Sequence, residues 1–267
     1  MTILGIVNIT TDSFSDGGQF LKPDAALTHG RQLVADGAHI LDLGAAASNP
    51  KAEAVSPETE IARLAPVVAA LQAEAIALSI DSFSPAVQSW ALDQGVAALN
   101  DIHGFAHPEL YPRLADSEAK LIVMHAVQPE GRATIDDIPA ETIFQRVVDF
   151  FSVRLEALER AHIATSRLIL DPGMGMFLSR RPEASYEMLA RIPELKRAFG
   201  LPVLIGVSRK SFLKNGRSPG TLPAATLAAE VFATCQGADY IRTHDVAALA
   251  AGLAVWGAAT GGNTTSI

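Results

Sequence analysis

The chain has 267 residues, of which 49% are hydrophobic and 19% charged, and its formal net charge is −8. This composition supports a large core and excludes an extensively disordered chain, and the acidic balance argues against a general binder of nucleic acid or anionic membranes. The one cysteine, Cys235, lies in an apolar run and is predicted to be a small core residue. No apolar stretch reaches about 18 residues and no basic leader is present, so we expect a cytoplasmic protein without membrane contact.

Eight short apolar runs recur along the chain, with helical patterns between them. They span residues 3–9, 39–43, 76–81, 97–101, 121–124, 168–170, 202–207 and 239–243. Most are continuous rather than alternating, which is typical of strands buried on both faces. Strand–helix alternation predicts a parallel sheet, and eight units in this length indicate an α/β fold of the (β/α)8 TIM barrel type, as a single domain over residues 1–267.

Helix signals lie between these runs. Ser56 before Pro57 and Ser84 before Pro85 each combine an N-cap residue with a first-turn proline. Asp245 is predicted to cap a last helix. A core-facing stripe at helical spacing comprises Ile143, Val147, Phe151, Leu155 and Leu158.

Polar side chains stand at the carboxyl ends of nearly all the apolar runs. They are Asn8, Asp42, Asp81, Asn100, Asp101, His125, Asp171, Ser208, Arg209, Lys210, Arg242, Thr243 and His244. In a (β/α)8 barrel these ends meet at one rim, where active sites are built. A strand-terminal aspartate often merely caps the next helix, and we interpret Asp101 and His125 as structural, but so many coincident cases are hard to explain by capping.

The chemistry of this rim fits one ligand. Asp81, Asn100 and Asp171 suit the amino-pyrimidinone edge of a flat heterocycle, because a carboxylate can accept two N–H bonds side by side. Asn8 offers a hard oxygen ligand of the kind that Mg²⁺ combines with substrate phosphate oxygens. Positive charges that suit a phosphate or pyrophosphate are Lys210, Arg242 and His244. The residues alone therefore predict a barrel enzyme for a phosphorylated heterocycle.

Ordered motifs over almost the whole chain resemble those of the dihydropteroate synthase family. They occupy residues 8–18, 42–50, 79–81, 100–102, 124–125, 171–175, 208–211 and 242–244. The resemblance implies condensation of 6-hydroxymethyl-7,8-dihydropterin pyrophosphate with p-aminobenzoate, giving dihydropteroate and pyrophosphate. It also implies Mg²⁺ as cofactor, these two small molecules as partners, and a homodimer.

The resemblance assigns roles to individual residues. The pterin would contact Asp81, Asn100, Ile102, Met124, Asp171, Gly175, Gly206 and Lys210. The pyrophosphate would contact Asn8, Ser48, Arg242 and His244, with Mg²⁺ on Asn8. The p-aminobenzoate would contact Phe14, Pro50, Met176, Lys210 and Ser211. The catalytic candidates, which would stabilise a pterin cation and the leaving anion, are Asp81, Asp171, Lys210, Arg242 and His244.

Three positions depart from the pattern of common family members. Ala46 stands at the position of a glutamate, Asn49 at that of an arginine, and Met176 at that of an aromatic residue. All three fall near the expected p-aminobenzoate side. The pattern resembles the mobile, sulfonamide-insensitive branch of the family, so we expect weak sulfonamide binding with retained turnover.

Three other functions stay open on the sequence. A methyltetrahydrofolate-type pterin methyltransferase would share the barrel but should lack the first loop around Phe14 and the pyrophosphate groups Arg242 and His244. A non-catalytic pterin-binding protein is suggested by Ala46 and Asn49. An unrelated phosphate-binding barrel would require the ordered motifs to be accidental.

Overall fold

The computed structural model describes residues 1–9, 23–46, 55–127, 136–214, 216 and 218–261. These residues form eight parallel strands: β1 (Thr2–Asn8), β2 (Ile40–Gly44), β3 (Leu78–Asp81), β4 (Ala98–Asp101), β5 (Lys120–Met124), β6 (Leu168–Asp171), β7 (Leu204–Ile205) and β8 (Tyr240–Thr243). The helices are α1 (Pro23–Ala35), α2 (Pro57–Ala73), α3 (Pro85–Asp93), α4 (Tyr111–Ala115), α5 (Ala140–Arg160), α6 (Pro182–Ala190), α7 (Ile192–Phe199), α8 (Leu222–Cys235) and α9 (Val246–Thr260). Short 3₁₀ turns include η3 (Gly175–Phe177) and η4 (Ser211–Leu213).

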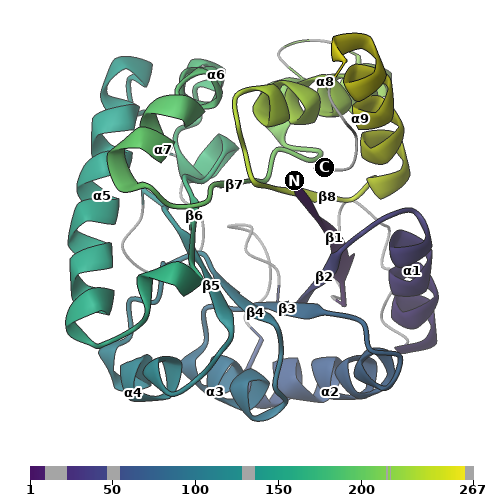
Figure 1. Ribbon diagram of the computed structural model, residues 1–267, viewed down its shortest axis with the longest axis vertical. Helices are drawn as coiled ribbons and strands as arrows, with labels where there is room; N and C mark the ends of the chain where they lie inside the picture. Colours follow the sequence, from purple (N-terminus) through teal and green to yellow (C-terminus); the bar gives the residue numbers. More distant parts are fainter. Residues whose placement is uncertain (10–22, 47–54, 128–135, 215, 217, 262–267) are drawn as a thin grey trace.

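The strands curl into a barrel with the helices outside it (Figure 1). Neighbouring strands pair in the order β6-β5-β4-β3-β2-β1-β8-β7. Between β6 and β7 the ring is completed by a parallel bridge from Leu170 to Val203 and by the bond from Leu170 N to Pro202 O, 2.9 Å long. The predicted (β/α)8 TIM barrel is confirmed.

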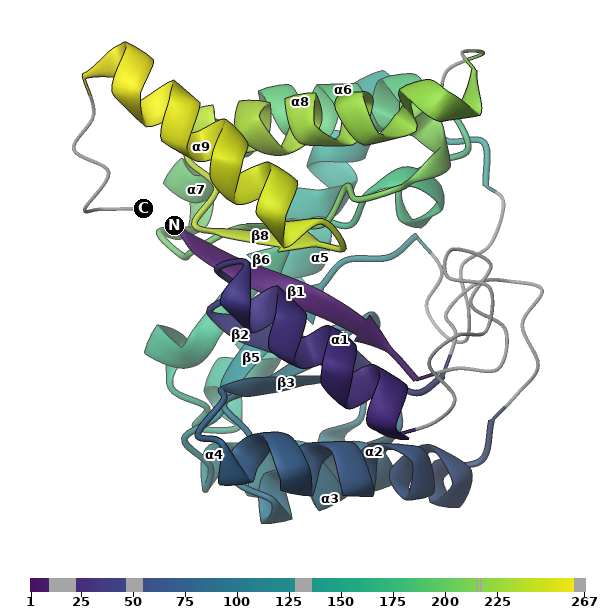
Figure 2. The same ribbon diagram turned by 90° about the vertical axis from the view of Figure 1, so that its right-hand side faces the viewer.

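The core has two layers. The larger one lies between the strands and the surrounding helices, and Figure 2 shows α1 and α2 in side view against β1 and β3. The smaller one fills the barrel interior with Leu4, Ile122, Ile169 and Leu204, flanked by Ile40 and Tyr240. This apolar plug closes the barrel below the strand ends, so polar chemistry is confined to the end above it.

Local signals in the sequence act as expected at several helix ends. Ser56 Oγ accepts the Thr59 N–H at 3.3 Å at the start of α2, and Asp245 accepts the Ala248 N–H at 3.1 Å at the start of α9. Ser84 precedes α3 in an extended conformation, although its side chain makes no capping bond. The stripe on α5 is buried, apart from its half-buried member Leu155.

The structure differs from the expectations in two respects. Two helices, α6 and α7, follow β6 where one was expected. Cys235 is exposed rather than a core residue, because it is the last residue of α8 and lies on a face turned away from the sheet. Among the helices that the structure describes, none is long and apolar enough to cross a membrane.

Candidate functional site

Strand alternation brings the predicted polar residues together. Successive side chains of a strand point to opposite faces, so residues two apart share a side. One step above the apolar plug, Leu4 is followed by Ile6 and Ile122 by Met124. On the same side of their strands, Ile40 is followed by Asp42, Ile169 by Asp171 and Tyr240 by Arg242. Across the strands, Ile6 lies beside Asp42, Asp81 beside Asn100, Met124 beside Asp171 and Leu4 beside Arg242.

A cavity of about 150 Å³ lies at this height. Its walls are Ile6, Asp81, Asn100, Ile102, Met124, Asp171, Phe177, Gly206, Ser208, Lys210, Arg242 and His244. The structure thus gathers into one cavity all the predicted catalytic residues and all the predicted pterin residues except Gly175. Gly175 lies just outside, where an added Cβ would be 3.5 Å from Lys210 Cδ.

Arg242 ties two aspartates together at the bottom of the cavity. Its Nε donates to Asp42 Oδ2 at 2.5 Å and its Nη2 donates to Asp81 Oδ2 at 2.6 Å. Asp42 is fully buried, and the Arg242 side chain is 20% exposed. Burial opposes the charge on Arg242, but Asp42 and Asp81 outweigh it and raise the pKa of the guanidinium, which stays charged. The charge of Arg242 therefore stabilises the buried carboxylate of Asp42 and the partly exposed carboxylate of Asp81.

Burial has a strong effect on Asp81. It raises the pKa of this carboxyl to about 7, assisted by the charge of Asp42 and opposed by Arg242. Asp81 is therefore divided between its two protonation states near neutral pH. The protonation state of a carboxyl group with such a pKa changes when a charged group binds beside it.

Two buried acceptors in this region have no donor among the described residues. Asn100 Nδ2 donates to Asp42 Oδ2 at 3.2 Å, which leaves Asn100 Oδ1 and Asp42 Oδ1 without partners within that part of the chain. Buried unpaired acceptors are costly. They favour a ligand rich in N–H groups.

The opposite wall of the cavity carries Asp171 and Lys210. Asp171 Oδ1 accepts the Gly173 N–H at 2.8 Å, and Lys210 Nζ donates to Met174 O at 3.0 Å. The Lys210 ammonium lies 4.9 Å from the centre of the Phe177 ring, within cation–π range. Burial lowers the pKa of Lys210 to about 8 although Asp171 raises it, and burial likewise raises the pKa of Asp171 although Lys210 lowers it.

The turn after β6 requires a glycine. Gly173 has φ +73°, and a Cβ at this position would lie 2.5 Å from the carbonyl oxygen of His125. Close contact with the neighbouring strand end thus fixes the position of Asp171. His125 itself is buried with its Nδ1 3.1 Å from Pro172 O, and burial lowers its pKa to about 4, which is consistent with the structural role predicted for it. Asp101 is also structural, because it accepts the N–H groups of His103 and Phe105.

Asn8 lies at the end of β1, outside the cavity walls but close to Asp81. A Cβ placed on Gly44 would be 3.8 Å from Asp81 Oδ2 and 3.9 Å from Asn8 Oδ1, so both oxygens border the same space. Within the described ranges, no group of three or more His, Cys, Asp or Glu residues could hold a metal ion. An oxygen pair of this kind fits a cation that takes most of its ligands from a substrate and water.

Ser208 connects the ends of β7 and β8. Its Oγ accepts the His244 N–H at 3.1 Å and lies 3.0 Å from His244 Nδ1. The Thr243 hydroxyl approaches the same oxygen at 3.4 Å. Ser208 thereby holds the His244 ring at the cavity wall.

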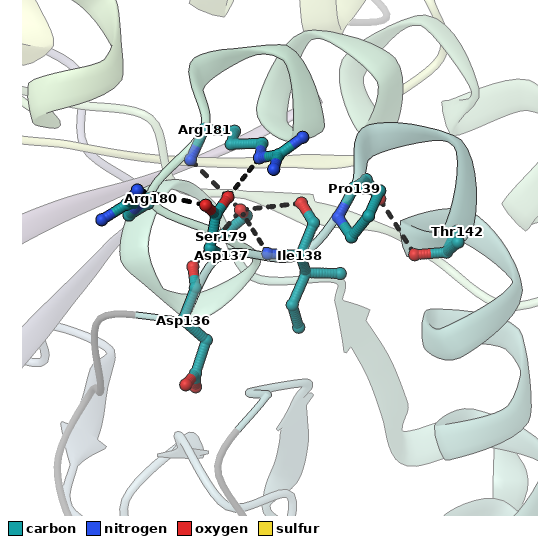
Figure 3. A network of polar contacts seen from close by, with 8 residues as sticks. All are labelled: Asp136, Asp137, Ile138, Pro139, Thr142, Ser179, Arg180 and Arg181. Atoms are coloured by element: carbon teal, nitrogen blue, oxygen red, sulfur yellow. Dashed lines mark hydrogen bonds and ion pairs between the residues drawn. The ribbon is translucent and has the colours of Figure 1, made fainter.

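A polar network outside the cavity anchors the segment after β6 to the start of α5 (Figure 3). Ser179 Oγ accepts the Ile138 and Arg181 N–H groups, each at 3.1 Å, and donates to Ile138 O at 2.9 Å. Asp137 pairs with Arg180 at 3.1 Å and also with Arg181. This bracing holds the turn that carries Phe177.

Several predicted residues lie elsewhere. Phe14, Ser48 and Pro50 fall outside the described residues, as does Asn49. Ser211 is exposed at the start of η4, and Met176 is half-buried, and neither lines the cavity. Their assignment to p-aminobenzoate stays a prediction.

The ligand contacts implied by the family resemblance did not include Phe177, Ile6 or Ser208. Phe177, the neighbour of Met176, is the aromatic side chain that lines the cavity. Asp42 was expected at most to brace the second loop, although it is the most buried partner of Arg242. The sequence does indicate Ile6 and Asp42, because each lies two residues before a strand end, Asn8 or Gly44. Residues two apart on a strand point to the same side.

Comparisons with known proteins agree with this geometry. The family model described as pterin binding enzyme matches residues 4–244. Dihydropteroate synthase type-2 of Escherichia coli is 55% identical over 257 residues, which cover 96% of this chain and 94% of that protein. Type-3 of the same species is 50% identical, with coverage of 95% and 97%, and type-1 of Pseudomonas aeruginosa is 47% identical, with coverage of 91% and 88%.

Solved structures are similar over the same length. Dihydropteroate synthase of Xanthomonas albilineans with 4-aminobenzoic acid has a TM-score of 0.86 and 36% identity, covering 97% of this chain and 93% of that one. The Anaplasma phagocytophilum enzyme with bound 6-hydroxymethylpterin-monophosphate has a TM-score of 0.84 and 30% identity, with coverage of 95% and 97%.

Proposed function

The chain belongs to the pterin binding enzyme family, and from this membership we propose that its barrel cavity carries out the dihydropteroate synthase reaction. The resemblance of the motifs to that family is confirmed. The enzyme is a transferase that joins 6-hydroxymethyl-7,8-dihydropterin pyrophosphate to p-aminobenzoate and releases pyrophosphate. One observation carries the assignment of the site: acids, an amide and bases from five strand ends line one small cavity above an apolar plug.

The pterin would occupy the wall of acids and amide. Asn100 Oδ1, which has no donor among the described residues, and the carboxylates of Asp81 and Asp171 provide acceptors for the N–H groups of an amino-pyrimidinone edge. Ile102 and Met124 supply apolar contact for the flat ring. Gly206 leaves the opposite side open for it, because it has no side chain.

The reaction breaks the C–O bond to pyrophosphate and forms a C–N bond to the amine of p-aminobenzoate, whose nitrogen releases one proton to solvent. Positive charge develops on the pterin as the bond to the leaving group breaks. Asp81 and Asp171 stabilise that charge from the ring side, while Arg242 and His244 bind the departing anion. These groups are already in place, so they need no reorganisation during the reaction. Lys210, held over Phe177, supplies a further positive charge at the cavity wall.

We propose Mg²⁺ as the cofactor, with Asn8 as its protein ligand beside Asp81. The donor set fits, because the carbonyl oxygen of Asn8 faces the space over Gly44 next to a carboxylate. When bound there with the substrate, Mg²⁺ would neutralise part of the charge on the pyrophosphate. Asn8→Ala should therefore weaken pterin pyrophosphate binding at low Mg²⁺ and be partly rescued at high Mg²⁺.

Pyrophosphate release on mixing both substrates with Mg²⁺ tests the function directly. Release that depends on p-aminobenzoate supports the assignment. Neither a methyltetrahydrofolate-type methyltransferase nor a non-catalytic pterin-binding protein would release pyrophosphate. A protein that binds the pterin but leaves the pyrophosphate attached would overturn the proposal.

We also propose weak sulfonamide inhibition with retained turnover. Ala46, two residues after β2, stands where common family members have a glutamate. Phe177 adds a large ring to the cavity wall. Inhibition of pyrophosphate release by a sulfonamide, measured beside a common family member, tests this. Equal potency against both enzymes would contradict it.

A homodimer is proposed from the family resemblance. Large apolar side chains are exposed on α8 and α9: Phe232 is 42% exposed, Trp256 45% and Val255 71%. Exposed apolar patches of this kind favour association. Sedimentation should give twice the mass of the chain, and Trp256→Glu should reduce it.

A further inference from the structure

A second cavity, which we call the α5 cavity, lies between the ends of β4 and β5 and helix α5. Its volume is about 390 Å³, against about 150 Å³ for the pterin cavity. Its walls include Ile102, His103, His125, Arg146, Phe150 and Arg154. Ile102 also lines the pterin cavity, so the two spaces are neighbours, but the other five residues do not. The chemistry described so far gives this space no role.

One face of α5 presents two arginines and an aromatic ring to the α5 cavity. Arg146, Phe150 and Arg154 follow one another at intervals of four residues, so they lie in one row along the helix. The Arg154 guanidinium lies 5.7 Å from the centre of the Phe150 ring. The edge of the His125 ring meets Phe150 at a centroid distance of 5.2 Å. Cationic and aromatic groups therefore border the same space.

The charge around the α5 cavity is positive, although the chain as a whole carries −8. Arginine side chains stay charged in proteins, and neither Arg146 nor Arg154 pairs with a carboxylate in the described part of the chain. Asp149 also lines the cavity, but it accepts the Gln145 amide at 2.8 Å. A cavity with two cations and one acid favours an anionic ligand.

Contacts behind the cavity hold Arg154 in place. Its Nη1 donates to Phe105 O at 2.9 Å, and the Tyr111 hydroxyl donates to the same oxygen at 3.1 Å. Arg146, in contrast, is exposed. Arg154 thus supplies a fixed charge, and Arg146 keeps its guanidinium available for direct contact with a ligand.

The turn after β4 gives the α5 cavity a fixed wall. Phe105 has φ +61°, and a Cβ on Gly104, which has φ +60°, would lie 2.9 Å from Phe150 Cζ. Asp101 accepts the N–H groups of His103 at 2.8 Å and Phe105 at 3.0 Å. Left-handed backbone at a residue other than glycine persists only where its surroundings hold it. The wall against Phe150 is therefore formed before any ligand binds.

We propose that the α5 cavity binds a small aromatic carboxylate. The carboxylate would accept two parallel N–H bonds from Arg146, and the charge of Arg154 would add attraction. The ring would lie against Phe150 and Ile102, because aromatic side chains pair well with a second ring. A ligand of this class uses both the cationic and the apolar part of the cavity, whose volume is in the ordinary range for ligand sites.

Benzoate is the probe, because it has the ring and the carboxylate but no amine that could react. In ¹H–¹⁵N spectra of the full-length protein at pH 7, the amide signals of Ala126 and Asp149, which both line the α5 cavity, should shift on addition of benzoate. The shifts should saturate with a Kd of about 1 mM. A linear response without saturation would overturn the proposal.

Arg146→Gln should raise this Kd about tenfold, since the charged pair with the carboxylate is lost. The matched control is Arg160→Gln on the same helix. Arg160 is 75% exposed, pairs with Glu156 and does not line the α5 cavity, so its loss should leave the Kd unchanged. Equal Kd values for the two variants would overturn the proposal.

A second probe tests the aromatic part of the proposal. Cyclohexanecarboxylate has the same charge but no aromatic ring, so it should bind about threefold more weakly than benzoate. Equal affinity of the two carboxylates would show that the cavity does not select an aromatic ligand and would overturn the proposal.

Lys210→Met distinguishes the α5 cavity from the pterin cavity. Lys210 lines the pterin cavity and not the α5 cavity. The variant should therefore keep the benzoate Kd measured at Ala126 and Asp149. A Kd that rises in Lys210→Met but not in Arg146→Gln would place benzoate in the pterin cavity and overturn the proposal. These titrations do not depend on turnover, so failure of the proposed function would leave their result intact.

Discussion

The two sides of the pterin cavity hold the same kinds of groups in different ways. On the Arg242 side, formed by Asp42, Asp81 and Arg242, the cation contacts both carboxylates directly at 2.5 and 2.6 Å. On the Lys210 side, formed by Asp171, Lys210 and Phe177, the acid binds the Gly173 N–H and the base binds Met174 O. Main-chain groups thus hold the Lys210 side, whereas side-chain ion pairs hold the Arg242 side.

This difference predicts which side of the cavity contributes to stability as well as to activity. Removing one member of a buried ion pair leaves an uncompensated charge, so the Arg242 side should respond to mutation in stability and activity together. The Lys210 side can lose a charge and keep its main-chain bonds. It should respond mainly in activity.

Arg242→Met should have the largest effect. It leaves Asp42 and Asp81 without their cation, and we expect the free energy of unfolding to fall by about 3–5 kcal/mol. Turnover should fall roughly 100- to 1,000-fold, as for loss of a preorganised donor. Urea unfolding and steady-state kinetics measure both, with Arg242→Lys as the charge-retaining control. Wild-type stability in Arg242→Met would remove the basis of the comparison.

Asp171→Asn should reduce turnover roughly 100-fold with little loss of stability. The amide oxygen can still accept the Gly173 N–H, and burial, which raises the pKa of Asp171, no longer opposes a charge. Because Asp171 raises the pKa of Lys210, that pKa should fall below about 8 in the variant. The rate of Lys210 acylation, measured as a function of pH, gives this pKa in wild type and variant. A stability loss as large as that of Arg242→Met would show that the two sides do not differ.

The pH dependence of the wild type should report Asp81. Its pKa of about 7 lies above the ordinary value, so kcat/KM should rise up to tenfold per pH unit below pH 7 as the stabilising carboxylate forms. The folded carboxyl binds its proton more tightly than the unfolded one. Its contribution to stability is therefore full below about pH 4 and is lost as pH rises to 7.

Asp81→Asn should remove the loss of folding stability that Asp81 causes between about pH 4 and pH 7. Urea unfolding at intervals between pH 4 and 8 tests it. A decline of equal slope in Asp81→Asn would assign the titration to another group.

Phe177→Leu should have the smallest effect. The ring face stabilises the Lys210 ammonium at 4.9 Å, and its loss should lower kcat/KM about threefold, in line with a modest cation–π contribution. Phe150→Leu is the matched control, because Phe150 lies under Arg154 and lines a different cavity. If both variants behave alike, the contact with Lys210 has no special value.

Much of the fold was predictable, because strands buried on both faces carry continuous apolar runs. All eight predicted runs coincide with strands to within two residues at each end, and the largest shortening is that of residues 202–207 to Leu204–Ile205. Its pairing is limited at one end by Pro202, which has no N–H group. The second helix after β6 was not expected, although Pro193 in the first turn of α7 marks a new helix start.

The site was predictable as a set of residues but not as a set of contacts. Polar strand ends and motif order identified Asp81, Asp171 and Lys210, because such residues rarely serve a core. The pairing of Arg242 with Asp42 depends on register across three strands, which sequence does not state. Cys235 was wrongly predicted to be buried, because an apolar helix end does not reveal which face meets the sheet.

The bridge between Leu170 and Val203 has a consequence for how ligands enter and leave. β7 has two residues, and the Lys210 side spans its junction with β6, whereas β2 and β8 both pair with β1 on the Arg242 side. Short pairing opens at low free-energy cost, so amide hydrogen exchange should be faster at Leu170, which donates to Pro202 O across the junction, than at Ile6. We therefore expect product to leave by opening of the barrel on the Lys210 side, while the ion pairs of Arg242 persist for the next substrate.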